Sequence, residues 1–171
     1  MNRYVDFWQV TSEALRSAAD RLQTPLSAAE IDGLMNAYLS PDVFEDAKTA
    51  LDSLKSVPLA ILSNGTPRML DAALRAHGLE SYFAHVLSVD EVRTYKPSPE
   101  VYALGTKTLG LAADTILFVS SNAWDVAGAK SFGYRVCWCN RSGEPMDGMG
   151  FEPDFIVARL GQIPNMLAGA D

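Results

Sequence analysis

Three clusters of polar residues follow apolar runs of the chain, and their side chains could carry chemistry on a small anion. The clusters are Ser63-Asn64-Gly65, Tyr95-Lys96-Pro97 and, as the longest, the segment 120–125. In open parallel sheets, ligands bind beyond the carboxyl ends of the strands, so we expect these clusters to meet at one site. Serine hydroxyls, an asparagine amide and a lysine ammonium can bind a carboxylate through polar and charge-assisted contacts.

The elements that must position these clusters are short strands that alternate with helices. The apolar runs suit strands buried on both faces, and they lie at 57–62, 86–89, 115–119, 135–139 and, as an edge strand, 154–158. Proline and glycine signals favour intervening helices at 67–77, 98–109 and 123–132. Alternation of strand and helix predicts a Rossmann-like parallel sheet in an α/β fold.

The first forty residues show helical spacing instead. Apolar side chains recur at near-helical intervals at Phe7, Val10, Leu15 and Ala18. Ser27 and Glu30 form the pattern of a capping box, which predicts a second helix through Tyr38. No strand is predicted before residue 57.

Composition limits the classes of function. The chain has 171 residues, 48% of them hydrophobic, which is enough for one domain with a core. Its formal net charge is -7 and its basic residues are scattered, so nucleic acid is not expected as a partner. The charged start and the lack of a long apolar run predict a cytoplasmic protein with no membrane partner.

The two cysteines, Cys137 and Cys139, stand two apart on a predicted strand. Their backbones would be roughly 6.6 Å apart, near the outer limit for a disulfide. No further cysteine, histidine or carboxylate accompanies them at the spacing of a metal site, so no metal is expected there. We interpret them as two small buried thiols.

Taken together, the three clusters resemble the motifs of the haloacid dehalogenase superfamily, and the resemblance covers essentially the whole chain. The segments that look like the versions of its L-2-haloacid dehalogenase branch are 61–65, 95–97 and 118–125. Residues 1–7 look like a piece of the helical cap of that branch. The resemblance implies that residues 1–40 are a remnant of the cap and that 41–171 form the α/β core domain.

For substrate binding, the resemblance assigns four residues. Ser63 matches the residue that helps to bind the substrate carboxylate, with Asn64 beside it. Phe7 and Trp124 match the apolar wall around the alkyl group and the departing halide. Each also has a structural interpretation, because Ser63 and Asn64 could turn the chain and cap a helix, and large aromatic residues are more often core.

For catalysis, the resemblance assigns five residues. Lys96 would place a positive charge near the nucleophile, and Tyr102 matches a tyrosine that stabilises the region of this lysine. Ser120, Asn122 and Asp125 match the group that positions and deprotonates the hydrolytic water. Alternatively, Lys96 could be a solvated loop residue and Asp125 a carboxylate in the first turn of a helix. Those separate interpretations do not explain why the clusters fall at successive strand ends.

The implied reaction is hydrolytic dehalogenation of (S)-2-haloacids to (R)-2-hydroxyacids through an aspartyl ester. The expected partner is a 2-haloalkanoic acid, no cofactor is expected, and the resemblance suggests a homodimer through cap helices. Phosphatases of the superfamily place several acidic residues in the third cluster to hold Mg²⁺. Only Asp125 is acidic there, which argues against a phosphatase and for a metal-independent hydrolase.

The sequence contains no segment like the Asp-x-Tyr-Gly-Thr loop that carries the nucleophilic aspartate of the superfamily. That loop ends the first strand, which is central and lies between the strands corresponding to 57–62 and 115–119. Asp6 lies in a predicted helical stretch and is not expected to replace it. We therefore expect this chain alone to be inactive, either as a fragment that starts at an internal Met or as a carboxylate-binding domain.

Overall fold

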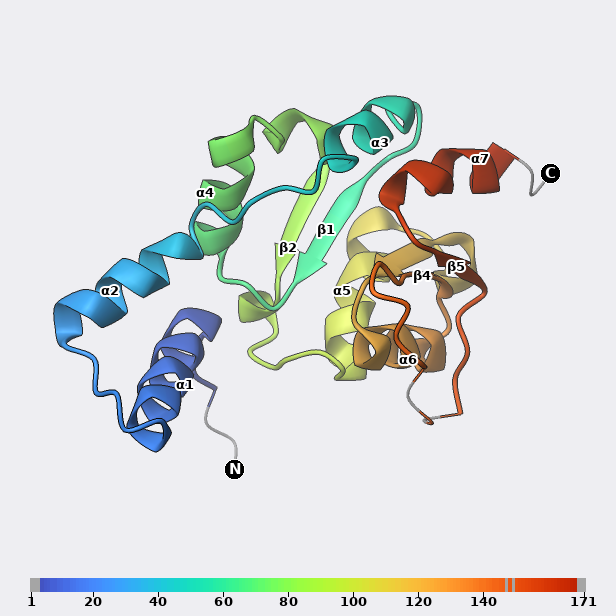
Figure 1. Cartoon of the computed structure of the whole chain (residues 1–171). Coiled ribbons are helices and arrows are strands. Elements are labelled where there is room, and N and C mark those ends of the chain that lie inside the picture. Colours follow the sequence, from blue (N-terminus) through green and yellow to red (C-terminus); the bar gives the residue numbers. More distant parts are fainter. Residues whose placement is uncertain (1–3, 147, 149, 169–171) are drawn as a thin grey trace.

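The computed structural model describes residues 4–146, 148 and 150–168, and it has the predicted α/β fold (Figure 1). Short parallel strands form two separate sheets. In the first, β1 (Ala60–Ser63) pairs with β2 (His85–Ser88). In the second, β4 (Arg135–Cys139) lies between β3 (Leu117–Ser120) and β5 (Phe155–Val157). The strands are shorter than most of the predicted runs, but they lie at the predicted places.

The helices that follow these strands begin and end where local signals direct. α4 (Pro67–His77) starts with a proline after the N-cap Thr66, whose side chain accepts a hydrogen bond from the Met69 amide. α5 (Pro99–Leu109) also starts with a proline, which suits the first turn. α6 (Ala123–Phe132) ends at Gly133, whose φ of 112° suits a residue without a Cβ. The three predicted helices are confirmed.

The sheet is divided between β1 and β3. Among the described residues, β1 pairs with β2 alone, β3 pairs with β4 alone, and no strand joins the two sheets. α5 connects them instead, because it contacts β1, β2 and α6. Leu62 of β1 and Phe118 of β3 both pack on the buried cluster that contains Tyr102. The two sheets therefore share part of one hydrophobic core although their backbones are not paired.

The prediction that all strands are buried on both faces is wrong at the start of β2, where Val86 is 40% exposed, and for the whole of β1 and β3. Their side chains are only partly buried, and Val119 is 37% exposed. β4 does fit the prediction, since it is flanked on both sides and four of its five side chains are buried. The physical reason is that no described strand covers the edges of β1 and β3 that are not paired.

The first two helices, α1 (Phe7–Arg21) and α2 (Ala28–Ala37), contact each other at one end of the molecule (Figure 1). The capping box of α2 at Ser27 and Glu30 is confirmed. The helical stretch predicted around Asp6 is wrong, because Asp6 is the N-cap of α1 and its carboxylate accepts a hydrogen bond from the Gln9 amide. This side chain thus begins the helix and lies outside it.

The remaining elements connect and cover the strands. A short helix that the sequence analysis did not identify, α3 (Ala47–Ser53), contacts the C-terminal α7 (Ile163–Ala168). Short 3-10 turns occur at η1 (Glu80–Tyr82), η2 (Val89–Glu91), η3 (Ala113–Thr115) and η4 (Leu160–Gln162). None of the described helices is both long and apolar enough to cross a membrane.

Both cysteines lie on β4, and both are buried and unpaired, as the sequence analysis predicted. Burial raises the pKa of the Cys137 thiol to about 11, because the thiolate would lose its hydration. The two side chains pack in the core beside Val157 and Ile163. They behave as small apolar groups there.

Candidate active site

Four of the predicted catalytic residues meet at the carboxyl ends of the strands. Lys96 Nζ lies 2.9 Å from Asp125 Oδ2, and the Ser120 hydroxyl donates to the same oxygen over 3.0 Å. The Tyr102 hydroxyl donates to Asp125 Oδ1 over 2.8 Å. These side chains come from the loop after η2, the end of β3, α5 and the first turn of α6. The topology therefore assembles the cluster from two regions of the chain, residues 96–102 and residues 120–125.

This cluster is buried and its polar groups are paired. The side chains of Lys96 and Asp125 are 8% and 4% exposed, and Lys96 Nζ lies 5.1 Å from the centroid of the Phe118 ring. Burial, and after it the negative charge of Asp125, raises the pKa of Tyr102 far above its ordinary value. The phenol is therefore a permanent donor to Asp125. A buried ion pair with this many donors fixes the carboxylate in one orientation.

The first cluster is joined to the second by Asn64, whose side-chain oxygen accepts a hydrogen bond from the Lys96 amide over 3.1 Å. Ser63 shapes the turn, because its hydroxyl oxygen accepts from the Gly65 amide over 3.0 Å. The Ser88 hydroxyl donates to the Gly65 carbonyl over 2.7 Å and braces the same turn from β2. The Ser63 O–H can still donate to an anion.

The structure does not bring Phe7, Asn122 or Trp124 into the cluster around Asp125. Phe7 lies against Tyr95, with 6.3 Å between ring centroids. Asn122 is exposed, and its backbone carbonyl accepts from the Asp125 amide at the start of α6. Trp124 is 39% exposed and lines a hollow of about 410 Å³ that Pro97 and Phe132 also line. The predicted roles of Phe7 and Trp124 in substrate binding and of Asn122 in catalysis stay predictions.

One residue that the sequence analysis missed is Gly128, which lies in the middle of α6. A Cβ at this position would stand 2.5 Å from the Tyr102 hydroxyl and 2.8 Å from Pro97 Cβ. Glycine costs about 1 kcal/mol inside a helix relative to alanine, so its presence there is a signal of a close contact. The missing side chain lets Tyr102 reach Asp125 and lets the loop after Lys96 pack on α6.

The donor set does not suit a hard cation. Both oxygens of Asp125 are already bonded to Lys96, Tyr102 and Ser120. Within the described ranges, histidine, cysteine and acidic side chains form no group of three that could hold a metal ion. Mg²⁺ sites use carboxylate oxygens that are available to the ion and to substrate phosphates.

The class that this fold and site define is that of the haloacid dehalogenase-like hydrolases. The family model described as "Hydrolase: haloacid dehalogenase-like hydrolase" matches residues 2–133 of the chain. Among solved structures, an L-2-haloacid dehalogenase from Xanthobacter autotrophicus with covalently bound chloropropionic acid superposes with a TM-score of 0.92 at 37% identity. That superposition covers 100% of this chain and 79% of the other.

Comparison with curated relatives identifies the family within these hydrolases to which the chain belongs. "(S)-2-haloacid dehalogenase 2" of Pseudomonas sp. (strain CBS-3) is 42% identical over 175 residues, which cover 100% of this chain and 76% of the relative. The (S)-2-haloacid dehalogenase of Pseudomonas sp. (strain YL) is 46% identical over 162 residues, or 94% of this chain and 70% of the relative. The chain belongs to the (S)-2-haloacid dehalogenase family of these hydrolases.

Proposed function

We propose that the protein acts in the hydrolytic dehalogenation of (S)-2-haloacids, giving (R)-2-hydroxyacids through an aspartyl ester. The observation that carries this proposal is the buried cluster of Lys96, Tyr102, Ser120 and Asp125 at the strand ends. Its ion pair leaves one fixed carboxylate that can take a proton from water. The names of the relatives supply the substrate class.

The proposed reaction has two steps. A carboxylate nucleophile attacks the carbon that carries the halogen, so that a C–O bond forms while the carbon–halogen bond breaks and halide leaves with the electron pair. Water then attacks the carbonyl carbon of the ester while Asp125 accepts a proton from that water. The bond between the carbonyl carbon and the alkyl oxygen breaks, the nucleophile is released as a carboxylate, and the alkyl oxygen takes the proton from Asp125 as the hydroxyacid departs. Ser63 and Asn64 would hold the substrate carboxylate, and Phe7 and Trp124 would line its alkyl group.

The nucleophile has to be a carboxylate that is not already engaged in hydrogen bonds of the structure, which excludes Asp125 and Asp6. Asp125 is bonded to three donors, and Asp6 caps α1. The resemblance implies that the nucleophile ends a strand between β1 and β3, and the described residues place no strand there. We propose that a strand bearing an aspartate completes the site at that position.

A chloride-release assay tests this proposal. The protein is incubated with (S)-2-chloropropionate and a synthetic peptide whose extended apolar sequence ends in an Asp-x-Tyr-Gly-Thr loop. The control peptide has asparagine in place of the aspartate. Chloride should appear only with the aspartate peptide, and neither EDTA nor added Mg²⁺ should change its rate, because no proposed step uses a metal.

Two outcomes would contradict the proposal. A strict requirement for Mg²⁺, together with phosphate release from a phosphomonoester, would support the alternative that the protein is a phosphatase. Binding of the acid with no chloride release in any mixture would favour a carboxylate-binding domain, the alternative that the divided sheet supports. The (R)-enantiomer is the matched control substrate and should release no chloride.

The proposed homodimer would form through α1 and α2. Large apolar side chains are exposed on or beside these helices, and they are Val10, Leu22, Leu34 and Tyr38. Such a surface suits a contact between two copies, although scattered apolar residues are common on monomers too. Sedimentation equilibrium would decide between the two states. The predicted cytoplasmic location stays a prediction.

A further inference from the structure

The segment that leads into α1 is bonded to the loop that carries Lys96. The Tyr95 hydroxyl donates to the Val5 carbonyl over 2.5 Å, across 90 positions of the sequence. The Tyr95 ring also packs against this segment in tilted contacts, with its centroid 5.4 Å from that of the Tyr4 ring and 6.3 Å from that of the Phe7 ring. Tyr95 therefore touches three of the four residues from 4 to 7.

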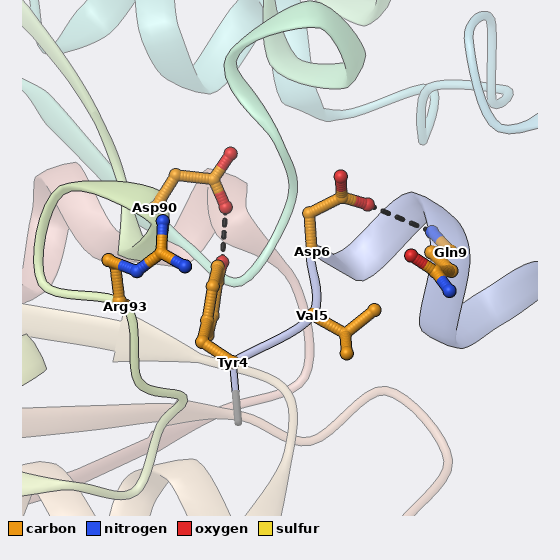
Figure 2. A pocket seen from close by; sticks show the side chains of 6 residues that line it. All are labelled: Tyr4, Val5, Asp6, Gln9, Asp90 and Arg93. Carbon is orange, nitrogen blue, oxygen red and sulfur yellow. Dashed lines mark hydrogen bonds between the residues drawn. The ribbon is translucent and has the colours of Figure 1, made fainter. Parts of the chain in front are cut away.

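A second set of contacts holds the same segment. The Tyr4 hydroxyl donates to Asp90 Oδ1, and the Arg93 guanidinium lies 5.2 Å from the centroid of the Tyr4 ring (Figure 2). Burial, and then the hydrogen bond to Asp90, raises the pKa of Tyr4 far above its ordinary value. The phenol thus stays protonated and donates throughout the usual pH range, so this contact does not depend on pH through Tyr4.

The start of α1 is also held by a residue of α4. Arg68, in the first turn of α4, lies 4.9 Å from the centroid of the Trp8 ring, and cation–π contacts of this kind are attractive. Arg68 follows the Ser63 turn closely, whereas Arg93 stands three residues before Lys96. The start of α1 is thus fixed between the two loops that carry predicted site residues.

Lys96 is the next residue after Tyr95 and is itself held at both ends. Its amide donates to Asn64, and its ammonium pairs with Asp125. A displacement of Tyr95 would therefore be transmitted to Lys96 through one peptide unit, and to Phe7 through direct ring contact. We propose that Tyr95 is a positioning residue that fixes the start of α1, and with it Phe7, relative to Lys96. The functional meaning of this role rests on the proposed function of Phe7 and Lys96.

The first test measures the position of α1 in the purified protein and needs no turnover. Spin labels at Arg16→Cys on α1 and Lys107→Cys on α5 report the distance distribution between them; both positions are exposed, and the natural cysteines are buried. Tyr95→Phe keeps the ring and removes the bond to Val5. The population of displaced arrangements should rise about fivefold, the effect of losing one neutral hydrogen bond. An unchanged distribution would overturn the proposal.

The matched control is Tyr82→Phe, which removes a hydroxyl bond of 2.6 Å to Asp52, between η1 and α3 and outside both loops. It should leave the distribution as in the wild type. If it broadens the distribution as much as Tyr95→Phe, the effect is general loss of stability and the proposal fails. If the Tyr95 hydroxyl only stabilised the fold, its removal would lower the free energy of unfolding without moving α1.

A second variant keeps the proposal testable if Tyr95→Phe does not fold. Tyr4→Phe removes only the bond to Asp90, and residue 4 is distant from Lys96 in sequence. Nuclear magnetic resonance should show a shift of the Lys96 amide signal in this variant and none in Tyr82→Phe. A Lys96 signal that stays in place would show that the segment and the loop are not coupled, whatever the outcome of the chloride assay.

Discussion

At the scale of single residues, Asp125 is the clearest example of a side chain that its hydrogen-bond partners hold in one orientation. Its two oxygens accept hydrogen bonds from Lys96, Ser120 and Tyr102, which come from three different elements. A carboxylate fixed in this way can accept a proton from water only from the direction that its partners leave open. An amide at the same position would keep much of the shape but would not act as the base.

Asp125→Asn is therefore expected to separate the two proposed chemical steps. In the mixture with the aspartate peptide, the ester should form once and then persist, because no group deprotonates the hydrolytic water. Chloride release should stop after about one equivalent, and mass spectrometry should detect an acyl adduct on the aspartate of the peptide. A variant that turns over at the wild-type rate without an adduct would refute the role of Asp125 as the base.

Gly128 offers a second prediction at this scale. Gly128→Ala should displace the Tyr102 hydroxyl from Asp125, because the new Cβ would stand 2.5 Å from it. We expect a loss of about 1–3 kcal/mol in the free energy of unfolding from this overpacking, measured by urea denaturation. Gly33→Ala is the matched control, since Gly33 is also helical and a Cβ there meets nothing within 4 Å. That variant should be as stable as the wild type or more so.

A rescue distinguishes overpacking from a change in the helix itself. Combining Gly128→Ala with Tyr102→Phe removes the hydroxyl that the new methyl group meets. The double variant should recover part of the lost stability, although its Asp125 would lack one donor. If the two losses simply add, Gly128 acts in some other way than by admitting the Tyr102 hydroxyl.

At the scale of elements, the strands differ in how their backbones are paired. β4 has a partner on both sides, whereas β1 and β3 each have one partner among the described residues. In a strand with one partner, alternate amides point away from the ladder. We expect amide hydrogen exchange to alternate between slow and fast along β1 and β3, and to be uniformly slow along β4. Uniform protection of β1 would show that a further strand already pairs with it.

The junction of α6, β4 and the segment before β5 depends on Asp154. Its carboxylate accepts from Lys130 Nζ over 2.6 Å and from the Val136 amide over 2.7 Å. Burial works to raise the pKa of Asp154, but these hydrogen bonds outweigh it, so the pKa lies below the usual value of 3.8. Asp154 therefore adds stability that is present above that value and is lost as the pH falls through the lowered pKa.

Asp154→Asn should consequently cost about 1–2 kcal/mol of the free energy of unfolding at pH 7. The difference between the variant and the wild type should disappear below the lowered pKa, because Asp154 is then protonated in both folded and unfolded wild-type chains. Urea denaturation across this pH range measures the effect. Asp71→Asn, which changes an exposed carboxylate beside Arg75, should alter stability by less than about 1 kcal/mol at any of these pH values.

Most elements could be predicted from the sequence because their ends carry local signals. α4 and α6 have the predicted bounds, since a proline or a left-handed glycine marks an end of each. The strand predicted at 57–62 begins later, at Ala60, because Val57 is apolar but exposed and Pro58 cannot donate to a ladder. α3 gave no comparable signal, because it is only seven residues long and has no side-chain cap.

Four of the predicted catalytic residues do lie together, whereas Phe7, Asn122 and Trp124 lie outside their cluster, and the contacts within the cluster were not predictable. The predicted topology placed Lys96, Ser120 and Asp125 after successive strands along the chain, at one edge of the sheet. That Tyr102 bonds to Asp125, and that Tyr95 bonds to Val5, depends on packing between segments far apart in the sequence. No local periodicity encodes such contacts, and the one available clue was a glycine inside a helix at Gly128.

At the scale of the whole molecule, α5 is the part that holds the two sheets together. It contacts β1, β2 and α6, and its Tyr102 lies in a core cluster with side chains from both sheets. The Tyr134 hydroxyl adds a further link by donating to the Tyr102 carbonyl over 2.7 Å. Tyr102 thus connects the hydrophobic core to the candidate active site. Substitutions that disturb the packing of this core are therefore expected to disturb the site as well.

The divided sheet also restricts how errors in assembly could affect the chemistry. A strand entering between β1 and β3 would have to match both neighbours, and a slip by one residue would move each of its side chains, the aspartate included, to the opposite face of the sheet. The smallest tolerable slip is then two residues, which moves the reactive carboxylate by about 6.6 Å along the strand. That is more than twice the length of a hydrogen bond. A complex in which the strand is paired in a shifted register would therefore have no activity, and not merely a reduced rate. Measurable chloride release would itself show that the strand is paired in the correct register.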